Sequence, residues 1–463
     1  MTLPATDGIL EKLQALLAYD ASSPLIFSSG LFLFLFAGFM LIYNAFRRAP
    51  MARIVYVILF SLYFYYKSSG IYFLLLIFAA TSDFLIAQGI YRVRSRAAKR
   101  WLVVLSVMVN LGMLGYFKYT NFLVDIANQM FGQGFLQFQN IFLPVGISFF
   151  VFQSMSYTID IYRGQLKPLG NWCDYLFYLS FFPQLVAGPI VRARDFIPQI
   201  RRNPVVVTRE MFGTGVFLIL TGLFKKAIIS DYISLNFVDR IFDEPLLYSG
   251  FECLAGIYGY ALQIYCDFSG YSDMAIGIAL LLGFRFPKNF DAPYKSATIT
   301  EFWRRWHISL SSWLRDYLYI SLGGNRKGKL RTYGNLLVTM VLGGLWHGAA
   351  IRFILWGTLH GVALALHKLW MAVVPGAKAS GAQMHWWSRA AGVFFTFNLV
   401  CLGWLMFRAE SMQTVELMLH QIFSNFNVPM IPQVIAGYAG VFALIGAGSV
   451  SYTHLRAHET PEH

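Results

Sequence analysis

Long apolar runs separated by short polar loops dominate the pattern of this chain. The run from Leu25 to Phe46 is 22 residues long and holds no charge, which is enough to cross a hydrocarbon core about 30 Å thick. The pattern predicts an all-α polytopic membrane protein. The apolar segments lie at about 25–46, 54–66, 71–90, 101–117, 143–161, 176–191, 211–224, 253–266, 271–284, 332–351, 353–366, 390–407 and 434–448.

Several of these segments are too short to be ordinary spans. A helix of 13 to 16 residues measures about 20–24 Å, which is less than the thickness of the hydrocarbon core. We therefore expect some segments to be re-entrant, or to line a depression that protein shields from lipid. Phe182-Pro183 and Gly188-Pro189 within segment 176–191 indicate a broken helix. About 10 to 12 membrane or re-entrant helices are expected in all.

The chain shows no internal repeat, and we interpret residues 1–448 as one membrane domain with polar interruptions at 192–210 and 285–331. The end of the chain differs in character. Residues 449–463 are polar, hold three of the nine histidines and resemble a translated sequencing adapter. We expect this segment to be an artefact, with native C-terminal segments missing. The alternative is a natural cytoplasmic tail.

Composition supports the membrane interpretation. Charged residues make up 13% of the chain and hydrophobic residues 57%, whereas globular domains carry about 25% charged residues. The net charge is +14, but the bases cluster in short loops, which predicts cytoplasmic loops rather than a nucleic-acid site. The four cysteines are scattered, so neither a disulfide framework nor a zinc knuckle is indicated. The basic clusters lie at 92–100, 201–202 and 326–331.

His347 is the strongest candidate for chemistry. It lies in Gly343-Gly-Leu-Trp-His-Gly348, within an apolar stretch that has no other ionisable group. A titratable group at membrane depth is costly and points to function. The flanking glycines would let another backbone or a thin substrate approach closely. The alternative is a core histidine bonded to a neighbouring helix, and this structural interpretation is preferred for His360 in a similar Trp-Gly-Thr-Leu-His-Gly sequence.

His307 lies in a second candidate region. Thr298 and Glu301 form a capping-box pattern that predicts a helix start. An apolar stripe through Phe302, Trp306 and Trp313 then follows at helical spacing, with His307 beside it. The alternative is an amphipathic helix lying at the membrane surface.

Charged residues near these histidines are candidates for supporting roles. Asp267 and Asp273 interrupt two apolar runs, and they could pair with Arg304 or Arg305, orient a histidine, or break the helix. A zinc site made by the histidines is not indicated, because no metal-ligand spacing such as H-E-x-x-H occurs.

Five ordered blocks of the sequence together resemble the membrane-bound O-acyltransferase family. The resemblance implies an all-helical ring around a thinned centre, with a tunnel that reaches the catalytic histidine. It maps the two active-site residues of the family to His347 and His307, and Trp346 and Gln153 join the supporting or substrate-binding residues. The blocks are Leu143–Gly164, Phe182–Ile190, Cys266–Ala275, Glu301–Leu310 and Gly344–Gly348.

The resemblance implies transfer of an acetyl group to an exported polysaccharide such as alginate, in the bacterial inner membrane. The donor would be acetyl-CoA or an acyl-carrier thioester, with no bound cofactor, and periplasmic acetyltransferase or relay proteins would be partners along with membrane lipid. His347 would be the general base, while His307 would orient the donor or polarise its carbonyl. The alternatives are D-alanyl transfer to teichoic acid, acetylation of peptidoglycan or cellulose, and, from another class, a transporter or lipid flippase.

Overall fold

The computed structural model describes residues 6–374 and 385–454, and every regular element in these ranges is a helix. The prediction of an all-α protein is therefore confirmed. The chain folds into two compact units, residues 1–219 with 274–287 and residues 220–273 with 288–463. The single domain over 1–448 stays a prediction. So does the artefactual end from Ser449, which falls partly outside the described residues.

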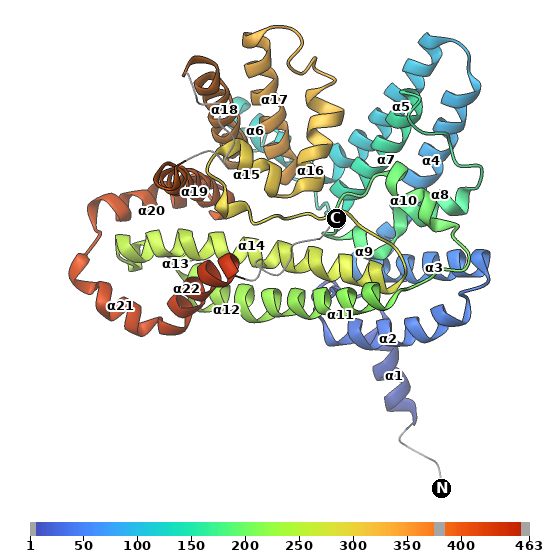
Figure 1. The fold of residues 1–463 in the computed structure, drawn as a ribbon, viewed down its shortest axis with the longest axis horizontal. Coiled ribbons are helices and arrows are strands. Elements are labelled where there is room, and N and C mark those ends of the chain that lie inside the picture. Colours follow the sequence, from blue (N-terminus) through green and yellow to red (C-terminus); the bar gives the residue numbers. More distant parts are fainter. Residues whose placement is uncertain (1–5, 375–384, 455–463) are drawn as a thin grey trace. The chain divides into compact units, whose positions relative to one another are not determined.

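The first unit is built from the helices of the N-terminal part of the chain (Figure 1). Within it, α4, α5, α7 and α8 pack on one another, and α3 packs on α8. The helices are α1 (Thr6–Leu17), α2 (Gly30–Ala45), α3 (Pro50–Ser69), α4 (Phe73–Arg92), α5 (Arg96–Leu114), α6 (Thr120–Phe131), α7 (Ile147–Tyr162), α8 (Trp172–Ser180), α9 (Phe182–Leu185), α10 (Ala193–Ile200) and most of α11 (Arg209–Leu223).

The second unit holds the segments in which the sequence places the candidate chemistry. Its core contains the aromatic rings of Phe302, Trp306, Trp356 and Trp404. The helices are α12 (Asp231–Ile233), α13 (Asp239–Asp243), most of α14 (Gly250–Leu281), α15 (Ile299–Arg305), α16 (Ile308–Trp313), α17 (Lys329–His347), α18 (Ile351–Val373), α19 (Trp386–Arg408), α20 (Met412–Ser424), α21 (Ile431–Gly437) and α22 (Ala439–His454).

Within the described ranges, four helical stretches are long and apolar enough to cross a membrane: Pro50–Arg92, Arg96–Phe131, Arg209–Asp243 and Trp386–Arg408. The pair Val428–Gly437 and Ala439–Gly446, bent by 91°, would make a fifth if it forms one span. The expected number of about 10 to 12 also included shorter and re-entrant segments, and it stays a prediction.

The broken helix expected around Phe182 is confirmed. Helix α8 ends at Ser180, Phe181 has an extended ψ of 109°, and α9 starts at Phe182. The Phe182 ring is fully buried among aromatic rings of α2 and α3, with centroids 5.0 Å from Phe60 and 5.7 Å from Phe39. The break thus seats a large ring in the core of the first unit.

Of the roles considered for Asp267 and Asp273, breaking the helix between segments 253–266 and 271–284 is excluded. Helix α14 runs without a break from Gly250 to Leu281. Asp267 and Asp273 do not open the helix, because each carboxylate forms a 2.6 Å ion pair with a lysine, Lys226 and Lys225 respectively. A paired carboxylate has no need to bind the backbone of its own helix, so the hydrogen-bond ladder continues.

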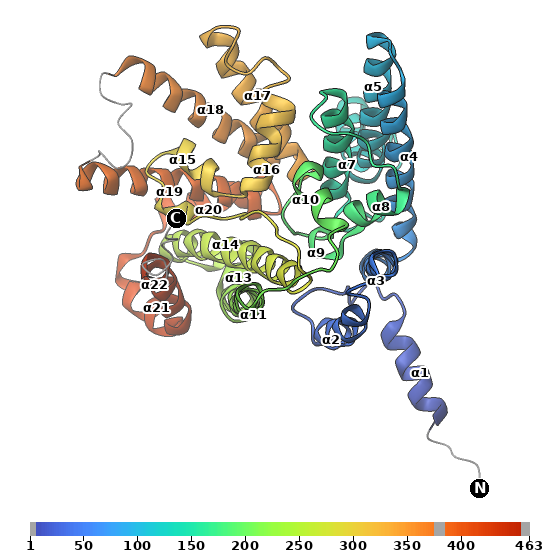
Figure 2. The same ribbon diagram turned by 45° about the vertical axis from the view of Figure 1, so that its right-hand side comes forward.

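Glycines bring α17 and α18 into close contact, and Figures 1 and 2 both show the two helices side by side. A Cβ at Gly344 would overlap the carbonyl oxygen of Phe353, and one at Gly361 would lie 2.9 Å from the Cα of Leu337. The glycine beside His347 therefore admits another backbone, as the sequence predicted.

Candidate active site

His307 is held in an unusual backbone conformation between two helices. The capping box is confirmed, because the Thr298 side chain accepts from the Glu301 amide at the start of α15. The single amphipathic helix expected from Thr298 onward is wrong, however. Helix α15 ends at Arg305, α16 starts at Ile308, and His307 adopts the left-handed region with φ 43° and ψ 56°. Such a conformation costs of order 1–3 kcal/mol for a residue other than glycine.

The segment that begins at Asn289 stabilises this turn. The Asp291 amide donates to the carbonyl oxygen of Arg305 at 2.8 Å, and the Ile308 amide donates to that of Asn289 at 2.8 Å. These two bonds hold the segment against both sides of the break. They explain how the chain tolerates a left-handed histidine at this point.

The side chain of Asn289 binds the imidazole itself. Its Oδ1 lies 3.2 Å from Nδ1 of His307 and accepts from the backbone amide of Ser309 at 3.2 Å. Its Nδ2 donates to Oγ of Ser272 at 3.0 Å. Because a backbone amide can only donate, the bond from Ser309 identifies Oδ1 as the atom that faces His307. An amide oxygen can only accept, so this contact favours the tautomer with the proton on Nδ1 of His307 and the lone pair on Nε2, while Oγ of Ser309 lies 3.4 Å from the same Nδ1.

The electrostatic environment favours this neutral form. His307 is 1% exposed and lies outside the four candidate spans. Burial lowers the pKa of His307 well below its ordinary value, and the positive charge that His347 can carry lowers the pKa further. At neutral pH, His307 is therefore an uncharged ring whose Nε2 can accept a hydrogen bond.

Trp346 lies beside both histidines. Its ring centroid is 6.3 Å from that of His307 and 4.9 Å from that of His347. His347 is the last residue of α17 and also contacts Trp356 and Phe407, with both centroids at 5.2 Å. The two histidines that the sequence singled out thus share one aromatic neighbour in one unit of the structure.

The end of α17 gives His347 a property that the sequence pattern did not show. The carbonyl groups at a helix C-terminus carry partial negative charge, which stabilises a cation there by about 0.3–1 kcal/mol. A histidine that takes up a proton at this position is favoured over one in the middle of the helix. His347 is also partly exposed, whereas His307 is buried.

His360 fits the structural interpretation. The indole Nε1 of Trp303 donates to its Nδ1 at 3.3 Å, and a Cβ at Gly403 would lie 2.8 Å from its Nε2. The ring is fully buried between these neighbours. Among the residues that the structure describes, no three His, Cys, Asp or Glu side chains gather as a metal site would require.

The motif from Asp267 to Asp273 contributes to the site through other residues than the sequence suggested. The Phe268 ring lies edge-on to His307 with centroids 4.6 Å apart, and Ser272 accepts from Asn289. These two residues are four apart and share one face of α14. Asp267 and Asp273 instead form their ion pairs with Lys226 and Lys225, so the proposed pairing with arginines is replaced by pairing with lysines.

The remaining predicted residues are placed as follows. Arg305 forms a 2.8 Å ion pair with Glu301 on its own helix, while Arg304 is exposed. Gln153 is buried in α7 of the other unit, so its supporting role stays a prediction. Sequence reasoning missed Asn289, because nothing in the polar interruption marks an asparagine whose partner is a histidine 18 residues further on.

Comparison with known proteins gives a consistent answer. Residues 165–413 match the family model of the membrane-bound O-acyltransferase family. The probable alginate O-acetylase AlgI of Pseudomonas aeruginosa is 43% identical, over 86% of this chain and 75% of that protein. The peptidoglycan O-acetyltransferase of Helicobacter pylori is 35% identical, over 84% of this chain and 78% of that protein. The teichoic acid D-alanyltransferase of Bacillus subtilis is 29% identical, over 58% and 70% respectively.

Proposed function

Because this chain belongs to the membrane-bound O-acyltransferase family, and is therefore a multi-pass membrane acyltransferase, we propose that it O-acetylates an exported polysaccharide, with alginate as the acceptor. The acceptor follows from the 43% identity to a probable alginate O-acetylase across most of both chains. The proposed donor is acetyl-CoA or an acyl-carrier thioester on the cytoplasmic side of the bacterial inner membrane. A periplasmic acetyltransferase or relay protein would deliver the acetyl group to the polysaccharide.

The reaction needs a base for one proton. The acceptor hydroxyl oxygen attacks the thioester carbonyl carbon, the new C–O bond forms, the C–S bond breaks, and the hydroxyl proton ends on the thiolate that leaves. We propose that His347 accepts this proton from the hydroxyl and then donates it to the thiolate, because the end of α17 stabilises the imidazolium that forms. The apolar rings of Trp356 and Phe407 around it would keep water away from the thioester.

His307 has a different role in this proposal. Polarising a carbonyl requires an N–H directed at the carbonyl oxygen, but the Nδ1 proton of His307 is directed at Asn289 and Nε2 is an acceptor. The carbonyl-polarising role expected from the resemblance is therefore disfavoured. We propose that Nε2 accepts a hydrogen bond from the substrate, such as one from the amide N–H of a pantetheine arm or from a second hydroxyl, and so orients it.

The observation that carries this proposal is that His307, held by Asn289, and His347 both contact Trp346. The test is transfer of labelled acetyl groups from acetyl-CoA in membranes that contain the protein, with and without periplasmic partner proteins and alginate. Label in alginate that depends on His347 supports the proposal. Transfer to peptidoglycan or of D-alanine, with none to alginate, would reassign the acceptor to that of the other relatives.

A further inference from the structure

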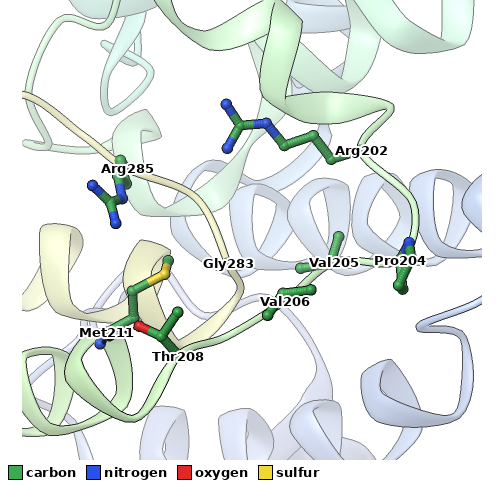
Figure 3. Close-up of a pocket in the computed structure, with 8 residues that line it drawn as sticks. All are labelled: Arg202, Pro204, Val205, Val206, Thr208, Met211, Gly283 and Arg285. Carbon is green, nitrogen blue, oxygen red and sulfur yellow. Dashed lines mark hydrogen bonds between the residues drawn. The ribbon is translucent and has the colours of Figure 1, made fainter.

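A cavity in the first unit combines positive charge with an apolar wall. It has a volume of about 370 Å³ and lies where the segment between α10 and α11 passes the end of α14 (Figure 3). Ligand pockets in proteins commonly measure about 300–1,000 Å³. Its polar groups come from Arg202, Thr208 and Arg285, and its apolar wall includes Val206 and Met211.

The walls of this cavity are held by specific bonds. Arg53 is 1% exposed, and its guanidinium donates to the carbonyl oxygens of Ile200 and Arg202 at 3.2 and 2.9 Å. The amide and carbonyl groups of Arg285 both bind the side chain of Gln199, at 2.8 and 3.2 Å. The backbones that carry Arg202 and Arg285 are therefore fixed before any ligand arrives, which lowers the cost of binding.

The two arginine side chains lack a counterion of their own. Among the residues that the structure describes, neither Arg202 nor Arg285 forms an ion pair, although Arg201 pairs with Asp174 at 2.6 Å and Arg194 with Asp195 at 3.7 Å. Both side chains are exposed, so a ligand can reach their guanidinium groups. Figure 3 shows the Arg202 side chain extending from its own segment toward the one that carries Arg285.

The position of the cavity at the end of a candidate span indicates which ligands can reach it. Arg209 begins both α11 and the candidate span Arg209–Asp243, so Thr208 and the cavity lie at the end of that span, where phosphate groups of a membrane gather. Thr208 caps α11 by accepting from the Met211 amide at 3.1 Å. Its hydroxyl hydrogen can therefore be donated to an anion.

We propose that this cavity binds a phosphate ester between Arg202 and Arg285, with the aliphatic part of the ligand against Val206 and Met211. Guanidinium groups bind phosphate oxygens through paired, charge-assisted hydrogen bonds. Two molecules of this chemistry reach such a place: an anionic phospholipid through its headgroup, and a CoA-type thioester through its phosphates. The CoA source rests on the proposed function, whereas the phospholipid source does not, so the two arms of the test separate failure of this site from failure of that function.

The experiment compares both sources on the purified full chain. Binding of CoA is measured by calorimetry in detergent, and binding of phosphatidylglycerol against phosphatidylcholine by native mass spectrometry. The variants are Arg202→Gln, Arg285→Gln and the double substitution, with Arg194→Gln as the matched control because Arg194 lies on α10 and is paired with Asp195. Thr208→Val adds a variant that removes a donor and leaves the charge unchanged.

We expect each single arginine variant to weaken the binding of CoA or of phosphatidylglycerol about tenfold or more, as is typical when a hydrogen bond to a charged group is lost. Arg194→Gln should leave both affinities unchanged. If the arginine variants lose CoA affinity, the ligand is the phosphate of the donor. If they lose phosphatidylglycerol binding while phosphatidylcholine binding is unchanged, the ligand is a lipid headgroup. Equal binding of all ligands by wild type and the double variant, or no binding of either ligand by wild type, would overturn the proposal. Should the double variant fail to fold, the single variants and Thr208→Val give the same comparison.

Discussion

The Nδ1 atom of His307 lies 3.2 Å from the side-chain oxygen of Asn289, and this one contact determines what the histidine can do. It favours the tautomer with the ring proton on Nδ1 and Nε2 as an acceptor. It also ties the left-handed turn at His307 to a segment 18 residues earlier. The position and the tautomer of His307 therefore both depend on Asn289, while burial keeps the ring neutral.

Replacement of Asn289 by aspartate tests this dependence through pH. Burial lowers the pKa of His307, so the ring stays neutral and active until the pH falls toward that low pKa. A carboxylate beside the Nδ1 proton favours the imidazolium and raises the pKa. We expect the acid limb of the pH–rate profile of Asn289→Asp to move to higher pH. Asn325→Asp adds the same charge at an exposed position in the loop before α17, outside the candidate spans, and should leave the limb in place.

Asn289→Ala removes the acceptor without adding charge. It removes the oxygen that accepts from the Ser309 amide and contacts Nδ1 of His307, and a buried polar group that loses its partner costs about 1–3 kcal/mol. Acetyl transfer should fall about 10- to 100-fold, with a lower melting temperature and no upward shift of the acid limb. An unchanged rate in the alanine variant would show that the contact does not position His307.

His347→Ala should abolish acyl transfer while the protein remains inserted and folded. Loss of a general base costs about 10²- to 10⁴-fold in rate, and alanine suits the end of α17 at least as well as imidazole does. The readout is labelled acetyl transfer per amount of protein extracted from the membrane. His385→Ala and His420→Ala are the controls and should be near neutral, because both residues are exposed. Wild-type rates in properly inserted His347→Ala would refute the assignment.

The pair Lys225–Asp273 should contribute stability rather than chemistry. Both side chains are about a quarter exposed, at 24% and 22%, so breaking the pair with Asp273→Asn should cost only about 1–2 kcal/mol, less than for a fully buried pair. Thermal unfolding in detergent measures this loss. The double variant Lys225→Met with Asp273→Leu removes both charges and should recover most of the stability, whereas a double variant less stable than Asp273→Asn would contradict the pairing role.

Helix α17 offers a matched test of its contact with α18. A Cβ at Gly344 would overlap the carbonyl oxygen of Phe353, while a Cβ at Gly334 on the same helix would have no heavy atom within 4 Å. Gly344→Ala should therefore lower the yield of folded protein and the melting temperature, by about 1–3 kcal/mol or more. Gly334→Ala should be neutral or stabilise by up to about 1 kcal/mol. Equal behaviour of the two variants would exclude the close backbone contact.

The sequence by itself determined the class of the protein and the identity of its two histidines. Long uncharged runs have one stable form in lipid, the helix, because every backbone polar group must be satisfied within the segment. Hydropathy alone therefore predicts an all-α membrane protein. His347 stood out for a similar reason, because an ionisable group in an apolar stretch is costly enough to indicate a purpose. The start of α15 was also readable, because a capping box is a local interaction between Thr298 and Glu301.

Only the tertiary structure decided how these parts work together. The break at His307 does not follow from local periodicity, which favoured one continuous helix; it depends on bonds from a segment distant in sequence. The continuity of α14 through Asp267 and Asp273 depends on lysines more than 40 residues earlier, and the same helix presents Phe268 and Ser272 to the site instead. The residues in these contacts are separated along the chain by distances that follow no helical repeat, so the hydropathy pattern cannot predict them. The folded structure alone brings Asn289 against His307, and this contact favours the proton on Nδ1.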